Sequence, residues 1–142
     1  MKVFFHADDF GVTYEQSKSI LECFEKGCLN SVSIIPNSKE TVASFELIKD
    51  YVASKQIRLV IHLNFVEGAC MADSQLVPHL IDDNGNFNCT YGSMLKLNYS
   101  RQSEAVCREF VHEIRAQIAA IVALTNDKKI CVDSHQHYLQ IP

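Results

Sequence analysis

The chain has 142 residues, a formal net charge of −4 and 47% hydrophobic residues, which suffices for one domain with a hydrophobic core over residues 1–142. It has no cluster of lysine and arginine residues and no apolar run as long as a membrane span, so we expect neither a nucleic-acid nor a membrane partner. The six cysteines form no Cys-x-x-Cys pair and the N-terminus does not resemble a signal peptide, which predicts reduced thiols and a cytoplasmic protein.

The first part of the chain indicates a strand followed by a helix. Residues 2–6 are a short run rich in apolar and aromatic side chains, which is typical of a buried strand. Thr13 and Gln16 have the spacing of a capping box, so a helix is predicted to begin there and to end at Gly27, a favoured residue after a helix. A first β/α unit is therefore expected.

A second unit of the same kind is expected next. Residues 31–35 predict a short strand, and Asn37 or Ser38 can cap the helix that follows it. Residues 57–65 predict a third strand, which carries His62. The helix between these strands is expected to place four apolar residues on one face: Val42, Phe45, Ile48 and Val52.

The rest of the chain is expected to hold a long loop, one helix and one strand. Between residues 66 and 101 the periodicity is lost and turn residues accumulate, which predicts a functional loop. Residues 103–125 predict a long helix, and residues 129–133 predict a fourth strand. The polar side chains expected to face solvent here are His79, Glu109, His112 and Arg115.

The order β-α-β-α-β-loop-α-β predicts an α/β fold with a parallel sheet and helices packed outside it. A parallel unit normally continues with another helix after a strand, so the fold is expected to be truncated. Ligands of such folds gather at the carboxyl ends of the strands. Acids and histidines lie at three of these predicted ends: Asp8, Asp9, His62, Asp133, His135 and His137.

Two histidines and one carboxylate form a common ligand set for a divalent metal ion with open positions. Simpler interpretations exist for each residue: Asp9 could cap the first helix, His62 could be packed in the core, and His-x-His also occurs by chance. Their convergence from three strand ends favours a metal site. His6 is expected to be a packed histidine that points away from this site or along its wall.

Three motifs carry a family resemblance. His-Ala-Asp-Asp-Phe-Gly at residues 6–11, Val-Ile-His-Leu-Asn-Phe at 60–65 and Val-Asp-Ser-His-Gln-His at 132–137 resemble, in this order, the strand-end motifs of the YdjC-like carbohydrate deacetylases. The resemblance covers essentially the whole chain. It implies parallel β/α units of a deformed (β/α) barrel of the polysaccharide-deacetylase type. It also implies a metal-dependent amidohydrolase that removes acetyl groups from N-acetylated sugars or oligosaccharides.

Position by position, the resemblance implies that Asp9, His62 and His135 are the metal ligands and that Asp8 is the general base, with an exchange of roles between the two aspartates left open. His137 is the candidate that would protonate the leaving amine. The expected ion is Mg²⁺, and Zn²⁺ is the alternative that two imidazole ligands favour.

The chain departs from this family in three ways. His6 stands where the family has Asn, Leu139 stands where many members have a further histidine, and members are much longer because they include a second half of the barrel. The alternative is therefore a catalytically incomplete half-barrel that binds metal or sugar and self-associates. Half a barrel leaves strand edges and apolar faces uncovered, so a homo-oligomer is expected. A phosphoesterase on a similar barrel is less favoured, because no Arg or Lys clamp lies near the motifs.

Overall fold

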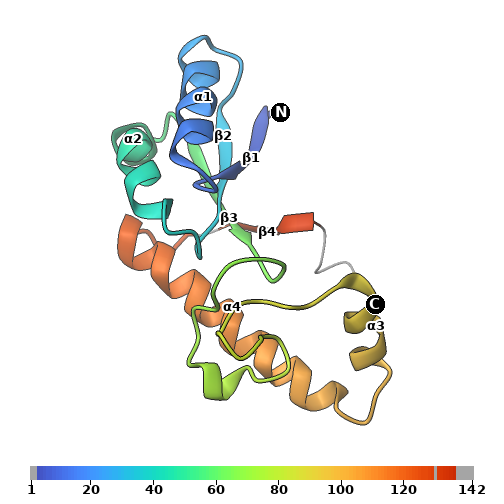
Figure 1. The fold of residues 1–142 in the computed structure, drawn as a ribbon. Helices are drawn as coiled ribbons and strands as arrows, with labels where there is room; N and C mark the ends of the chain where they lie inside the picture. Colours follow the sequence, from blue (N-terminus) through green and yellow to red (C-terminus); the bar gives the residue numbers. More distant parts are fainter. Residues whose placement is uncertain (1–2, 130, 137–142) are drawn as a thin grey trace.

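The structure is a computed structural model that describes residues 3–129 and 131–136. Figure 1 shows the strands beside α1 and α2, with α4 running from the sheet toward α3. None of the described helices is both long enough and apolar enough to cross a membrane. In chain order the elements are β1 (His6–Phe10), α1 (Tyr14–Glu25), β2 (Ser31–Ile34), α2 (Thr41–Ala53), β3 (Arg58–Leu63), the short 3₁₀ helix η1 (Ser74–Leu76), α3 (Tyr91–Asn98), α4 (Ser103–Thr125) and β4 (Cys131–Ser134).

The four strands form one parallel sheet in the order β1-β2-β3-β4. This confirms the α/β fold with a parallel sheet that the alternation of elements predicted. Because neighbouring strands run in the same direction, their carboxyl ends lie along one edge of the sheet. Within the described residues, β1 and β4 each pair with a strand on one side only.

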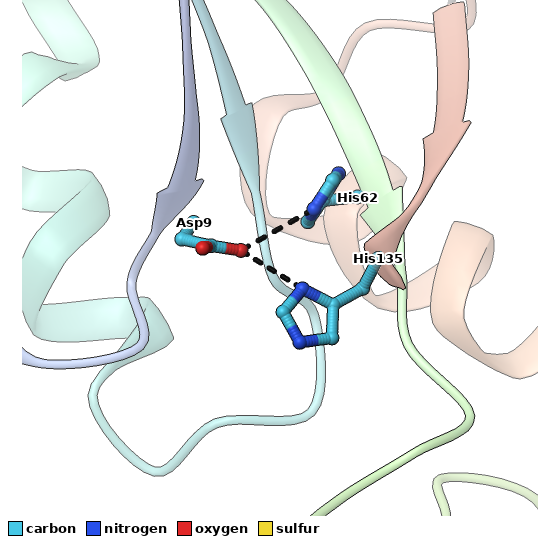
Figure 2. Close-up of side chains that lie close together, drawn as sticks. All are labelled: Asp9, His62 and His135. Carbon is cyan, nitrogen blue, oxygen red and sulfur yellow. Dashed lines mark hydrogen bonds and ion pairs between the residues drawn. The ribbon is translucent and has the colours of Figure 1, made fainter. Parts of the chain in front are cut away.

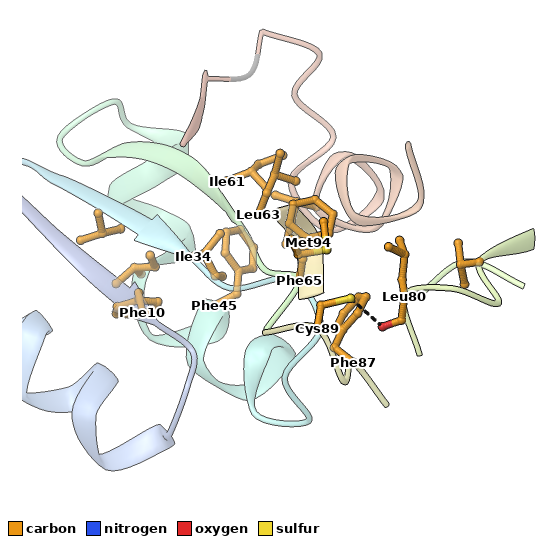
Figure 3. Close-up of a cluster of buried hydrophobic side chains, with 14 of the residues drawn as sticks. Phe10, Ile34, Phe45, Ile61, Leu63, Phe65, Leu80, Phe87, Cys89 and Met94 are labelled. Carbon is orange, nitrogen blue, oxygen red and sulfur yellow. Dashed lines mark hydrogen bonds between the residues drawn. The ribbon is translucent and has the colours of Figure 1, made fainter. Parts of the chain in front are cut away.

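The two faces of the sheet differ in polarity, because side chains alternate along each strand. Val32, Ile34, Ile61 and Leu63 are buried in the core with side chains from α2, α4 and the loop after β3 (Figure 3). The residues between them on the same strands point to the opposite face. That face carries polar groups from all four strands: His6, Asp8, Ser31, Ser33, His62 and Asp133.

The first strand begins later than predicted. Of the expected strand at residues 2–6, residue 2 lies outside the described part, and residues 3–5 precede β1 with Phe5 62% exposed. Aromatic content alone suggested burial, but the pairing of β1 with β2 begins at His6. Asp8 and Asp9 therefore lie within the strand rather than after it.

The cap of the first helix was predicted correctly, and that of the second was not. The Thr13 side chain accepts a hydrogen bond from the backbone N–H of Gln16 at the start of α1. At α2, Glu40 is the N-cap residue and makes no capping bond through its side chain. The Ser38 hydroxyl instead accepts a hydrogen bond from the backbone N–H of Glu40, before the helix begins. Val42, which was expected on the packed face, is 60% exposed.

The segment from 66 to 101 is more ordered than the predicted loop. It contains η1 and α3, and Thr90 with Ser93 forms a capping box at the start of α3. The loss of periodicity was misleading because the buried residues are spread over turns. These residues join the main core across the long segment (Figure 3): Val77, Leu80, Phe87, Cys89 and Met94.

Helix α4 matches its predicted range, but its buried face carries polar residues. Glu109, Glu113 and Gln117 are all buried, and each is hydrogen-bonded to the segment that follows β3. Glu109 was expected to face solvent, and so was His79, yet Glu109 accepts hydrogen bonds from the backbone N–H and from Nδ1 of His79. Arg115 is exposed as predicted.

Glu113 is fully buried and holds the segment after β3 by accepting from the backbone N–H groups of Met71 and Ala72 and from Nε2 of Gln117. Replacing Glu113 by Ala leaves these donors without an acceptor. We predict that Glu113→Ala lowers the free energy of unfolding by about 3 kcal/mol, measured by urea denaturation.

Glu104→Ala on the same helix is the matched control, since the Glu104 side chain is 86% exposed and pairs with Arg108 at the surface. It should cost less than about 1 kcal/mol. Equal destabilisation by the two variants would contradict a structural role for the buried carboxylate.

Candidate metal site

Three side chains from the carboxyl ends of separate strands meet at one edge of the sheet, with His135 directly after β4 (Figure 2). Asp9 Oδ1 lies 3.3 Å from Nε2 of His62 and 2.9 Å from Nδ1 of His135. One ligand atom from each of the three residues falls within 4.8 Å of the others. Atoms that coordinate one ion at about 2.0–2.2 Å lie about 3 Å apart, so this spacing fits a single divalent cation.

The backbone of Asp9 makes this meeting possible. Its φ is 64°, and the pairing of β1 with β2 shifts register between Ala7 and Phe10. In a regular strand, Asp8 and Asp9 would point to opposite faces of the sheet. Aspartate tolerates the left-handed region better than most residues, and such conformations gather at functional sites. Gly11, with φ 93°, lets the chain leave the strand directly afterwards.

His62 is oriented from its other side by Asp133. Nδ1 of His62 donates to Oδ1 of Asp133 at 2.6 Å, because a carboxylate can only accept. In the neutral ring, the Nε2 lone pair then lies on the side of Asp9, where a cation would bind. Metal-ligating histidines commonly donate their second ring N–H to a carboxylate in this way.

The same hydrogen bond shifts the pKa of both partners. Burial is the largest influence on the pKa of His62 and lowers it, but the bond to Asp133 and the charges of Asp133, Asp8 and Asp9 outweigh burial and raise it. Burial alone would raise the pKa of Asp133, whereas the hydrogen bonds from His62 and Ser33 lower it below its usual value. The neighbouring carboxylates thus favour an imidazolium at His62 when no metal ion is present.

Asp8 lies beside these three residues, in a second group with His6 and Asp133. Its Oδ1 is 3.2 Å from Nε2 of His6, and its side chain is 62% exposed. His6 was expected to be a packed histidine, which is wrong. Its ring is partly exposed, and its two nitrogens lie within hydrogen-bond distance of Ser31 and Ser33 along the wall of the site.

His135 contacts Asp9 through Nδ1, while its Nε2 points away from Asp9 (Figure 2). Nε2 is the one buried side-chain nitrogen or oxygen within residues 3–129 and 131–136 that has no hydrogen-bond partner. Oε1 of Glu67 is 3.7 Å away from it. His137, the expected proton donor, lies outside the described residues.

Sequence reasoning assigned no role to three residues that line the site. Asp133 was placed at a strand end without a function, and Ser33 and Glu67 were not considered. Ser33 donates to Oδ2 of Asp133, 100 residues away in the chain. The contacts of Ser33 with Asp133 and of Glu67 with His135 correspond to no regular spacing in the sequence. The one sequence signal for the polar face is the alternation of Ser31 and Ser33 with apolar residues.

A pocket of about 420 Å³ opens beside the site, between the loops that follow β1, β2 and β3. Its walls include Asn37, Lys39, Asn64, Glu67 and Gly68, so Glu67 borders both the pocket and His135. Another pocket, of about 330 Å³, lies at the amino ends of β3 and β4, away from the residues of the candidate metal site.

Comparisons with known proteins support the family resemblance that the three sequence motifs indicate. A model of the family described as "YdjC-like protein" matches residues 2–142. Carbohydrate deacetylases of Danio rerio and Xenopus laevis are 25% and 28% identical over the whole chain, which covers 43% and 44% of their lengths. A carbohydrate deacetylase of Clostridium beijerinckii is 27% identical over 96% of the chain and 50% of its own length.

A similar fold occurs in a solved structure from Enterococcus faecalis V583, that of a protein described as a cellobiose-phosphate cleavage protein. The TM-score is 0.72 at 23% identity, over 94% of this chain and 48% of that one. This likeness shows a shared fold. The chain spans about half the length of the curated relatives it matches.

The His62–Asp133 pair predicts how stability depends on pH in metal-free protein. The pKa of His62 is higher in the folded protein than in the unfolded chain. Its contribution to the free energy of unfolding is therefore complete below the unfolded pKa of about 6.5, and it is lost as the pH rises through the folded pKa. Because the folded pKa of Asp133 is lowered, its contribution is present above about pH 4 and is lost as pH falls through the folded value.

With EDTA present, the free energy of unfolding of the wild type should therefore fall more steeply than that of Asp133→Asn as the pH rises above about 6.5. Urea denaturation at each pH measures this difference. Asp83→Asn, which removes an exposed charge in a distant turn, should follow the wild type. Parallel curves for the wild type and Asp133→Asn would refute the coupling.

Proposed function

The chain belongs to the YdjC-like protein family, and we propose that it carries the metal-binding part of a hydrolase that removes acetyl groups from N-acetylated sugars. The curated relatives named carbohydrate deacetylase support this activity, since they align with almost the whole chain. The observation that carries the proposal is the meeting of Asp9, His62 and His135 at one edge of the sheet.

A divalent cation is the proposed cofactor of these three residues. Their donor set is one carboxylate and two imidazoles, with further positions left for water and substrate. Mg²⁺ is the ion that we expect from the family resemblance, and Zn²⁺ is the alternative that suits the imidazoles. When bound, such an ion would polarise the acetyl carbonyl and lower the pKa of water at the site.

Asp8 is the proposed general base, because the other two carboxylates are engaged. Asp9 faces the two histidines, and Asp133 accepts from His62 with one oxygen and from Ser33 with the other. Asp8 is the exposed acid of the three, and it can accept the proton of the water that attacks the acetyl carbon. His137 remains the proposed donor to the leaving amine.

The pocket beside Glu67 is the proposed place for the sugar. Its lining residue Glu67 is 3.7 Å from His135, and the side chains of Asn37, Lys39 and Asn64 in its wall can form hydrogen bonds with sugar hydroxyl groups. Its volume of about 420 Å³ is within the range of small-ligand sites.

Acetate release from N-acetylated chitooligosaccharides tests this proposal. We expect release that EDTA abolishes and that Mg²⁺ or Zn²⁺ restores. His62→Ala should reduce the rate at least about 100-fold by removing a proposed ligand, whereas His112→Ala on α4 should leave it unchanged. Release that is insensitive to EDTA and to His62→Ala would contradict the metal-dependent mechanism.

Absence of release by a chain that still binds metal would favour the second candidate, an incomplete half-barrel that binds metal or sugar and self-associates. Unpaired edges at β1 and β4 support it within the described residues, as do the exposed side chains of Phe5 and Val132 at these edges. Association of two copies would cover both features.

We therefore propose a homodimer at micromolar concentration, measured by size-exclusion chromatography with light scattering. Val132→Asp should shift the mass toward that of one chain, because it places a charge at an edge that association would bury. Val111→Asp is the matched control, since Val111 is exposed on α4, away from both edges. A wild type that remains a monomer would refute self-association.

A further inference from the structure

His135 poses a hydrogen-bonding problem that the three proposed ligands do not solve. The residue is 9% exposed, and its buried Nε2 has no partner within the described part of the chain. Its Nδ1 faces Oδ1 of Asp9 at 2.9 Å. A buried ring N–H without an acceptor costs free energy, so a nearby acceptor would stabilise the ring.

Cation binding determines which nitrogen of His135 carries the proton. The two ring nitrogens that face Asp9 are Nε2 of His62 and Nδ1 of His135. To bind a cation, each must offer a lone pair and therefore carry no proton. On His62, Asp133 secures this by accepting from Nδ1. On His135 the proton must then be on Nε2, the atom without a partner.

Glu67 provides a carboxylate close to that atom. Its Oε1 is 3.7 Å from Nε2 of His135, somewhat longer than a hydrogen bond. The Glu67 side chain is 64% exposed, so small rotations about its side-chain bonds can close this gap. A negative charge there favours the proton on Nε2 over the proton on Nδ1.

The backbone of Glu67 is held in place while its side chain stays free to adjust. The amide groups of Asn37 and Asn64 both donate to the carbonyl of Glu67, at 3.0 and 2.9 Å. Gly68 follows with φ 80°, and a Cβ atom there would lie 3.2 Å from Nδ2 of Asn37. The ends of β2 and β3 thus fix the position from which Glu67 reaches His135.

We propose that Glu67 is a positioning residue that accepts from Nε2 of His135 and holds its Nδ1 lone pair toward the bound cation. This inference rests on the proposed metal site. Each imidazole ligand then has its own carboxylate, Asp133 for His62 and Glu67 for His135. Loss of such a carboxylate typically weakens metal binding about 10- to 100-fold.

Mn²⁺ titration followed by electron paramagnetic resonance tests this role, because Mn²⁺ favours oxygen and nitrogen donors over the thiols of the six cysteines. Glu67→Ala should raise the Kd about 10- to 100-fold, and Glu67→Gln, which keeps an acceptor oxygen, should raise it less. Glu22→Ala, at an exposed position on α1, should leave the Kd unchanged.

The tautomer of His135 gives a readout that a purely structural role would not move. With ¹⁵N-labelled histidine and no metal ion, where either ring nitrogen can hold the proton, long-range ¹H–¹⁵N spectra should show a larger fraction of His135 protonated on Nε2 in the wild type than in Glu67→Ala. Urea denaturation of the metal-free variant should match the wild type, which separates positioning from loss of folding.

The outcomes separate this inference from the function it rests on. Wild-type protein that binds no Mn²⁺ would overturn the metal site, and the positioning role with it. Wild-type protein that binds Mn²⁺, with a Kd that Glu67→Ala changes less than twofold and an unchanged tautomer, would overturn the role of Glu67 alone.

Discussion

Parallel pairing of neighbouring strands in chain order is the constraint on which the candidate site depends. It places the carboxyl ends of β1, β3 and β4 along one edge, so residues 9, 62 and 135 meet although long stretches of chain separate them. Alternation along each strand then sorts side chains by face. Apolar residues of β2 and β3 enter the core, and the hydroxyl, imidazole and carboxylate groups between them share the other face.

A shared polar face makes the protonation states of its groups interdependent. Asp133 contacts His62 with one oxygen and Ser33 with the other, so the group that orients a proposed ligand is itself oriented from β2. His6 and Asp8 extend this network to β1. The proposed division of roles follows from these contacts, because a carboxylate with both oxygens engaged is a poor base and an exposed one is available.

The segment after β3 depends on a second set of buried polar contacts. Glu109, Glu113 and Gln117 on α4 bind backbone groups of this segment, and Asn64 links it to the end of β3. A turn-rich segment becomes ordered because its backbone donors find buried acceptors on a helix. Asn37 and Asn64 hold the backbone of Glu67 in the same segment, beside His135, so the fold of this segment and the geometry of the candidate site are connected.

Local periodicity and a general property of parallel sheets were enough to predict the four parallel strands, the helices α1, α2 and α4, and the strand ends that carry Asp9, His62 and His135. The start of β1, the regular structure within residues 66–101 and the burial of Glu109 depend on tertiary contacts. Glu109 had been expected on a solvent-facing side of its helix. Tertiary structure also decided the partners Asp133, Ser33 and Glu67. Contacts between residues up to 100 positions apart follow no periodic pattern in the sequence. A polar residue on a helix is predicted to be exposed unless the buried group that it binds is known.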